Sequence, residues 1–100
     1  MLKRIMMWRL NDVAQEQQKK DNGLAVKDRL EQLTGKIPEI EHFKVALNIA
    51  DDPAAADVVL ISFFADRPAY LRFLDHPEHK KVMEFVESVT SERWFVEYEG

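Results

Sequence analysis

The chain has 100 residues and a net charge of −4, and it is 46% hydrophobic and 32% charged, with 3 Gly and 4 Pro. This composition excludes a disordered or collagen-like chain, and the length allows one domain, residues 1–100, with a single core. The acidic balance argues against nucleic acid as the main partner, because phosphate binding needs a basic surface.

No apolar run approaches the ~18 residues that a membrane helix needs, so we expect no membrane partner. The first residues, MLKRIMMWRLND, do not have the continuous apolar region and small-residue cleavage site of a secretory signal. The absence of Cys excludes disulfides and cysteine metal sites, and it fits a reducing compartment. We therefore expect a cytoplasmic protein.

Residues 2–10, LKRIMMWRL, are apolar-rich and bounded by Asn11-Asp12, which predicts a strand. Asn11 or Asp12 offers an N-cap for a helix that runs to about Thr34, with Gly35 placed to end it. The front half of that helix, AQEQQKKDNG, is polar and is interrupted by Gly23. We expect this half to pack loosely or to kink.

Residues 41–49, EHFKVALNI, alternate between apolar and polar side chains, which predicts a strand with one buried face. The buried face of this strand would hold Phe43, Val45, Leu47 and Ile49. A loop over residues 50–56 then turns the chain. Residues 57–65, DVVLISFFA, are apolar on both faces, which is typical of a central strand.

Asp66 is placed to cap a second helical segment, with Pro68 in its first turn. Pro77 has no backbone N–H to donate, so this segment must kink or restart near His76. A helix from Pro77 to about Val89 follows, and residues 92–99, ERWFVEYE, predict the last strand. The apolar face of this helix contains Val82, Phe85, Val86 and Val89.

The order strand, helix, strand, strand, helix, strand predicts a ferredoxin-like α+β fold, with a four-stranded antiparallel sheet and two helices on one face. Whichever parity faces the helices, large apolar side chains would remain on the other face, because Trp94 and Val96 oppose Phe95 on the last strand and residues 57–65 are apolar on both parities. An open apolar face of that size predicts a homodimer in which two sheets meet. The sheets would enclose a barrel-like cavity for a small ligand, and the alternative is a filled dimer core without a cavity.

One compact cluster could carry chemistry, Asp75-His76-Pro77-Glu78-His79, at the break in the second helical segment. His79 falls in the first turn of the helix that begins at Pro77, where the positive end of the helix dipole favours a neutral imidazole. A neutral histidine at the mouth of a pocket can act as a general base. His76 and His79 could share a metal ion, but the cluster lacks a third ligand, so we expect no metal. His76 is also suited to local capping.

Five segments resemble the stress-responsive dimeric α/β barrel domain family (Dabb). In chain order they are LKRIMMWRL followed by Asn-Asp, GKIPEIE, DVVLISFF followed by Ala-Asp, HPEHKKV and RWFVEYE. The resemblance covers essentially the whole chain and implies a ferredoxin-like protomer and a homodimer joined through its sheets. It also implies a distant relation to small monooxygenases, haem-degrading enzymes and muconolactone isomerases.

The resemblance to one member of this family, a plant polyketide cyclase, implies roles for single residues. The catalytic histidine of that cyclase, which withdraws a proton to drive an intramolecular aldol closure, matches His79. Its assisting tyrosine matches Phe73, which has no hydroxyl, and a histidine near the start of its first strand matches Arg4. The resemblance therefore implies that the base is retained while the assisting groups differ.

The first hypothesis is an enzyme of cyclase or lyase type that acts on a small hydrophobic or anionic molecule without a cofactor. His79 would be the general base, and Arg4 would anchor an anion because its guanidinium matches a carboxylate. The further candidates for substrate-binding residues are Met6, Trp8, Phe73 and His76. The alternative is a non-catalytic, stress-associated dimer, and a third interpretation is a cofactor-independent monooxygenase or a haem-handling relative.

Overall fold

The computed structural model describes all of residues 1–100, and a single main sheet organises the chain. This sheet contains β1 (Leu2–Leu10), β4 (His42–Leu47), β5 (Val58–Phe64) and β6 (Thr90–Glu99). The helices are α1 (Lys19–Glu31), the short 3-10 helix η1 (Gln32–Gly35), α2 (Arg67–Asp75) and α3 (Pro77–Val89). None of the helices is both long and apolar enough to cross a membrane.

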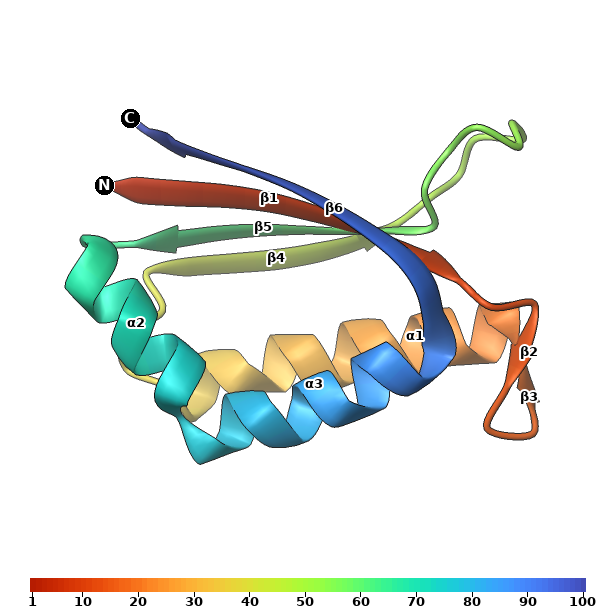
Figure 1. Cartoon of the computed structure of the whole chain (residues 1–100), viewed down its shortest axis with the longest axis horizontal. Coiled ribbons are helices and arrows are strands. Elements are labelled where there is room, and N and C mark those ends of the chain that lie inside the picture. Colours follow the sequence, from red (N-terminus) through yellow and green to blue (C-terminus); the bar gives the residue numbers. More distant parts are fainter.

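The strand order in the sheet is β4-β5-β1-β6, and all neighbouring strands are antiparallel. This is the predicted ferredoxin-like arrangement, with β5 and β1 in the centre and β4 and β6 at the edges (Figure 1). The prediction of a central strand over residues 57–65 is confirmed by β5, which is one residue shorter at each end.

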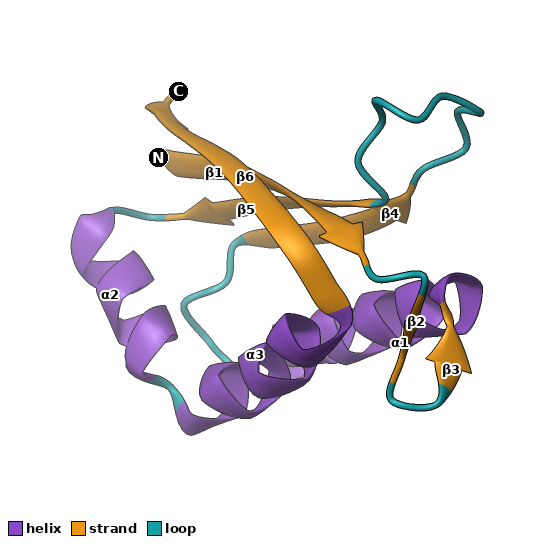
Figure 2. Cartoon of the chain, turned by 45° about the vertical axis from the view of Figure 1, so that its right-hand side comes forward, coloured by secondary structure: helices purple, strands orange, loops and turns teal.

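The helices lie on one face of the sheet, as predicted, and the opposite face carries no helix (Figure 2). Alternation decides which side chains they cover. On β5, Val58, Leu60 and Phe64 are buried against the helices, together with Trp8 from β1 and Val86 from α3. The core therefore lies between the sheet and the helical layer.

The prediction of a helix beginning at Asn11 or Asp12 is wrong over its front half. Residues 13–18 form a small hairpin, with β2 (Val13–Ala14) paired to β3 (Gln17–Gln18). At its tip, Gln15 and Glu16 have φ values of 52° and 62°, in the left-handed region. The segment carries no apolar stripe that a helix could bury. Instead the buried Asn22 side chain donates a hydrogen bond of 2.9 Å to the Ala14 carbonyl, which holds the hairpin against α1.

The predicted strand over residues 41–49 is too long at its end, because β4 stops at Leu47 and not at Ile49. The Asn48 side chain exchanges two hydrogen bonds of 2.9 Å with the backbone of Ala50. This local pairing turns the chain away from the sheet, as Asn side chains do in turns. Ile49, expected on the buried side, is fully exposed.

The prediction of a helix break at Pro77 is confirmed. Asp66 caps α2 by accepting a hydrogen bond of 2.9 Å from the Ala69 N–H. α2 ends at Asp75, and α3 restarts at Pro77 with His76 as its N-cap.

Candidate functional site

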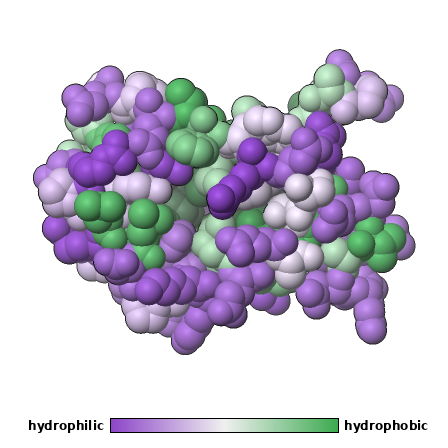
Figure 3. Space-filling view, viewed as in Figure 1, coloured by the Kyte–Doolittle hydropathy of each residue, from purple (hydrophilic) through white to green (hydrophobic).

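A pocket of about 420 Å³ lies between the helix-covered face of the sheet and helices α2 and α3. Nine of its 16 lining residues are hydrophobic, which is typical of a small-molecule site of this size. The space-filling view, taken from the side of the sheet, shows a hollow with apolar side chains at its centre and hydrophilic ones around it (Figure 3). Five of the sequence-predicted residues line this pocket: Arg4, Met6, Trp8, Phe73 and His79.

The position of this pocket differs from the expected one. We expected a cavity between two sheets that meet face to face, on the side without helices. Arg4, Met6 and Trp8 instead belong to the parity of β1 that faces the helices, so the pocket that they line lies inside one protomer. The alternation along a strand assigns its side chains to two opposite faces, but it does not predict which of these faces the helices will cover.

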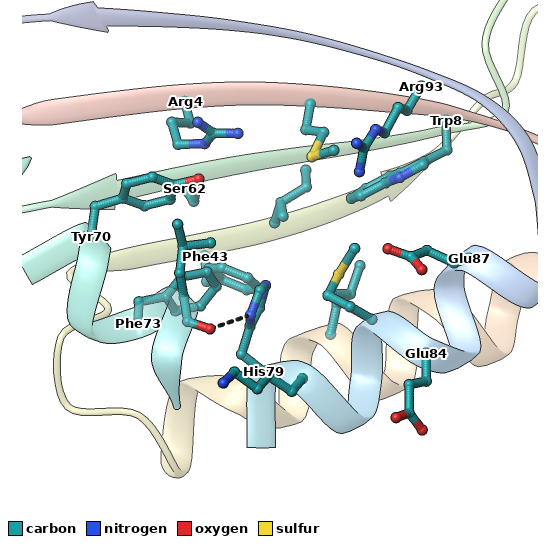
Figure 4. A pocket seen from close by; sticks show the side chains of 16 residues that line it. Arg4, Trp8, Phe43, Ser62, Tyr70, Phe73, His79, Glu84, Glu87 and Arg93 are labelled. Atoms are coloured by element: carbon teal, nitrogen blue, oxygen red, sulfur yellow. Dashed lines mark hydrogen bonds between the residues drawn. The ribbon is translucent and has the colours of Figure 1, made fainter. Parts of the chain in front are cut away.

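His79 projects from the first turn of α3 into the pocket (Figure 4). Its Nδ1 lies 3.3 Å from the carbonyl oxygen of Leu74, and its ring packs against Phe73 with 4.4 Å between the ring centroids. A carbonyl oxygen can only accept a hydrogen bond, so in the neutral ring the proton is assigned to Nδ1. This tautomer leaves Nε2 with the free lone pair that a base requires.

The surroundings of His79 lower its pKa below the ordinary value of 6.5. Burial is the largest cause, because it disfavours the charged imidazolium. The nearby positive charge of Arg4 acts in the same direction, while the Leu74 carbonyl opposes it by favouring the protonated ring. The predicted neutral state thus has a physical basis, although burial rather than the helix dipole is the main cause.

Arg4 lines the pocket, but its charge already has a partner inside the protein. Its guanidinium forms an ion pair with Glu97 on β6, and Glu97 also pairs with Arg67 at 2.7 Å. The guanidinium lies 4.5 Å from the centroid of the Tyr70 ring and 4.8 Å from that of Phe95. An anionic ligand at this position would therefore have to share Arg4 with Glu97.

The structure does not bring His76 into the pocket, which corrects its prediction as a substrate-binding residue. Its Nδ1 accepts a hydrogen bond of 3.1 Å from the Glu78 N–H, so the side chain caps α3. This is the local capping role that the sequence also allowed. The direction of the side chain follows from the cap geometry, since an N-cap side chain turns back towards the first helical N–H groups.

Several polar residues that line the pocket were missed by the sequence reasoning. They are Ser62 on β5, Tyr70 on α2, Lys80, Glu84 and Glu87 on α3, and Arg93 on β6. Spacing could have indicated two of them. Tyr70 precedes Phe73 by one helical turn, and Arg93 lies directly opposite Trp8 in the strand register.

No group of three or more His, Cys, Asp or Glu side chains in the chain is arranged to hold a metal ion. Glu84 and Glu87 lie one helical turn apart on α3, and His79 lies nearer the start of the same helix (Figure 4). The chemistry that the lining residues themselves can perform is proton transfer and hydrogen bonding.

A four-stranded antiparallel sheet with helices on one face, and a pocket beneath those helices, defines the class of ferredoxin-like α+β domains. The family model of the stress responsive A/B barrel domain (Dabb) matches residues 2–100. The chain therefore belongs to the Dabb family.

Similar proteins include an uncharacterised protein of Streptomyces coelicolor, 30% identical over 80 residues, which is 80% of each chain. A dimeric protein of unknown function from Bacteroides fragilis, with a ferredoxin-like fold, has a TM-score of 0.85 at 28% identity, over 99% of this chain and 95% of its own. A hydroxynitrile lyase from Passiflora edulis has a TM-score of 0.79 at 15% identity, over 97% of this chain and 90% of its own, which shows likeness of fold alone.

Proposed function

We propose that this protein binds a small, mostly apolar molecule in the pocket and removes a proton from it, with His79 as the general base. The observation that carries this proposal is the state of His79. Its Nδ1 faces the Leu74 carbonyl oxygen and its pKa is lowered by burial, so that Nε2 is available as a base at neutral pH. The reaction class is that of a lyase or cyclase that needs no cofactor.

The lining supports an apolar substrate with one polar end. Met6, Trp8 and Phe73 provide apolar walls on both the sheet and the helix side. Arg4 lies among them as a hydrogen-bond donor whose charge is balanced by Glu97. A carbonyl oxygen of the bound substrate fits this position, because Glu97 leaves only part of the guanidinium free to donate.

The test is an α-proton exchange experiment with 4-phenylbutan-2-one, an apolar ketone with acidic C–H groups. The protein is incubated with the ketone in D₂O, and loss of the α-proton signals is followed by NMR. We expect exchange to be faster than in buffer and His79→Gln to lower the enzymatic rate by about 10²- to 10⁴-fold, the usual contribution of a general base.

The matched control is His42→Gln, because His42 is exposed on the face of the sheet without helices. This variant should keep the wild-type exchange rate. Exchange by the wild-type protein no faster than in buffer would contradict the proposal. So would a His79→Gln variant that stays folded and fully active. If His79→Gln instead unfolds the protein, the residue is structural, as in the non-catalytic dimer hypothesis.

We further propose that the functional unit is a homodimer joined through the face of the sheet without helices, here called the open face. Apolar side chains gather on it, including Met7 on β1 and Trp94, Val96 and Tyr98 on β6, each about 40% to 50% exposed. Patches of this kind mark protein interfaces. The Bacteroides fragilis protein, which shares the fold, is described as dimeric, and this supports a homodimer here.

A further inference from the structure

One polar corner of the pocket consists of Arg4, Ser62 and Tyr70. Arg4 on β1 and Ser62 on β5 lie directly opposite each other in the strand register, with both side chains on the helix-covered face. The Tyr70 ring from α2 lies against the Arg4 guanidinium, 4.5 Å from its centroid. We call these three side chains the polar corner.

The side chains of Ser62 and Tyr70 are almost completely buried, and neither hydroxyl makes a hydrogen bond to the protein. Ser62 is 4% exposed and Tyr70 is 8% exposed. Every fully buried side-chain oxygen or nitrogen in the protein has a hydrogen-bond partner. The two unpaired hydroxyls are therefore not fully buried, and they face the pocket that Ser62 and Tyr70 line. The cost of burying an unpaired hydroxyl is avoided only if water or a ligand completes these bonds.

The surroundings of Tyr70 hold its hydroxyl in place. The ring packs edge-on against Phe64 at 5.3 Å and nearly parallel to Phe73 at 6.2 Å between centroids. Arg4 covers it from the sheet side, and the ion pairs of Glu97 with Arg4 and Arg67 fix that cation. A donor that is held rigidly in a dry site stabilises negative charge at little reorganisation cost.

Phe73 lies between the polar corner and His79. Its ring is 6.2 Å from the Tyr70 ring and 4.4 Å from the His79 imidazole, measured between centroids. Tyr70 and His79 make no hydrogen bond with each other, and both point into the same pocket (Figure 4). A small molecule that lies over Phe73 can therefore contact the base at one end and the polar corner at the other.

We infer that the polar corner binds the carbonyl oxygen of the substrate and stabilises the oxyanion that forms there, with Tyr70 as the main donor and Ser62 as the second. This rests on the proposed role of His79 and defines the substrate class as a carbonyl compound with an acidic α C–H. His79 Nε2 takes the α-proton, the electron pair of the C–H bond forms the C=C bond, and the carbonyl π pair moves to the oxygen. Tyr70 and Ser62 donate hydrogen bonds to that oxygen, and the imidazolium later returns the proton.

The test uses 4-nitrophenol, whose ionised form mimics an enolate and is coloured, so its ionisation in the pocket is read by absorbance. We expect binding to lower the pKa of 4-nitrophenol. Tyr70→Phe should weaken nitrophenolate binding by about 10- to 100-fold, and Ser62→Ala by a smaller factor, because each removes a hydrogen bond to a charged oxygen. Binding of nitrobenzene, which has no ionisable oxygen, should not change in either variant.

The control variant is Ser88→Ala, which removes an exposed hydroxyl of α3 that does not line the pocket. It should bind nitrophenolate as the wild type does. The inference is overturned if 4-nitrophenolate does not bind the wild-type protein, or if folded Tyr70→Phe binds it as tightly as the wild type does. Because this readout requires no proton abstraction, loss of ketone exchange together with a retained Tyr70 effect would refute the role of His79 and leave the polar corner intact.

Discussion

The two faces of the main sheet carry similar apolar side chains, but only one face is covered by the helices. On β5, Leu60 and Phe64 are buried under the helices, while Ile61 and Phe63 point to the open face. On β1, the helix side holds Trp8 and the open side holds Met7. The comparison teaches that hydrophobicity alone marks both faces as contact surfaces. What distinguishes them is the helical layer, which leaves a pocket with polar groups on one side and an uncovered apolar sheet on the other.

The largest expected effect compares the two tryptophans, one on each face. Trp8 is 1% exposed and Trp94 is 40% exposed. Trp8→Ala should lower the free energy of unfolding by about 3–5 kcal/mol, because it leaves a large cavity in the core. Trp94→Ala should change the stability of the separated monomer by about 0.5 kcal/mol or less. Urea denaturation measures the free energy of unfolding of both variants, at protein concentrations below the dissociation constant of the dimer. Equal losses of stability in the two variants would contradict the distinction between the faces.

The second effect concerns assembly through the open face. Ile61→Asp places a carboxylate in the middle of that face, and we expect dimerisation to weaken by more than about 100-fold, since an unpaired charge would be buried. Leu71→Asp is the matched control, because Leu71 is half-exposed on α2, on the helical side. Sedimentation velocity distinguishes monomer from dimer. A wild-type protein that sediments as a monomer, or a dimeric Ile61→Asp variant, would refute the open-face interface.

The third effect is the pH dependence that the helix-covered face confers through His79. Since burial lowers the pKa of His79 below 6.5, the base limb of the ketone exchange profile should lie below that pH. The free energy of unfolding should also fall at low pH, because His79 binds a proton more readily in the unfolded chain than in the folded one. The contribution is fully present above pH 6.5 and is lost as pH falls from there through the folded pKa. Thermal unfolding of wild type and His79→Gln as a function of pH should show this loss only in the wild type.

The smallest expected effect tests whether His76 caps α3 without contacting the ligand in the pocket. His76→Ala should lower the free energy of unfolding by about 1 kcal/mol, because the Glu78 N–H loses its acceptor. His76→Asn should restore most of this stability, since Asn is a good N-cap. Both variants should bind 4-nitrophenol as the wild type does. A weakening of probe binding in His76→Asn would show instead that His76 contacts the ligand.

Much of the fold was predictable because it depends on local rules. The alternation of apolar residues predicted β4, and short apolar runs predicted β1 and β5. Asp66 and Pro77 predicted where α2 and α3 begin. The β2–β3 hairpin was not predictable in this way. It forms because Asn22, on the following helix, satisfies a carbonyl of the hairpin, and such a contact between segments leaves no periodic signal.

The candidate site was predictable only in part. His79 and Phe73 belong to one short segment, and Arg4, Met6 and Trp8 share one parity of one strand, so the sequence could group them. The placement of His76 at the cap followed from the helix start, which the sequence also indicated. The place of Ser62 in the pocket was not evident, because nothing in its own segment distinguishes it from an ordinary strand residue.

The sequence by itself determined the order of the elements, the break before Pro77 and the presence of two apolar faces on one sheet, because spacing, caps and parity are local properties. The tertiary structure decided which face receives the helices, and therefore on which side of the sheet the pocket lies. It also decided that Glu97 neutralises Arg4 and that Ser62 and Tyr70 lie beside it. These contacts join β1, β5, β6 and α2, and only the packing of distant segments could create them.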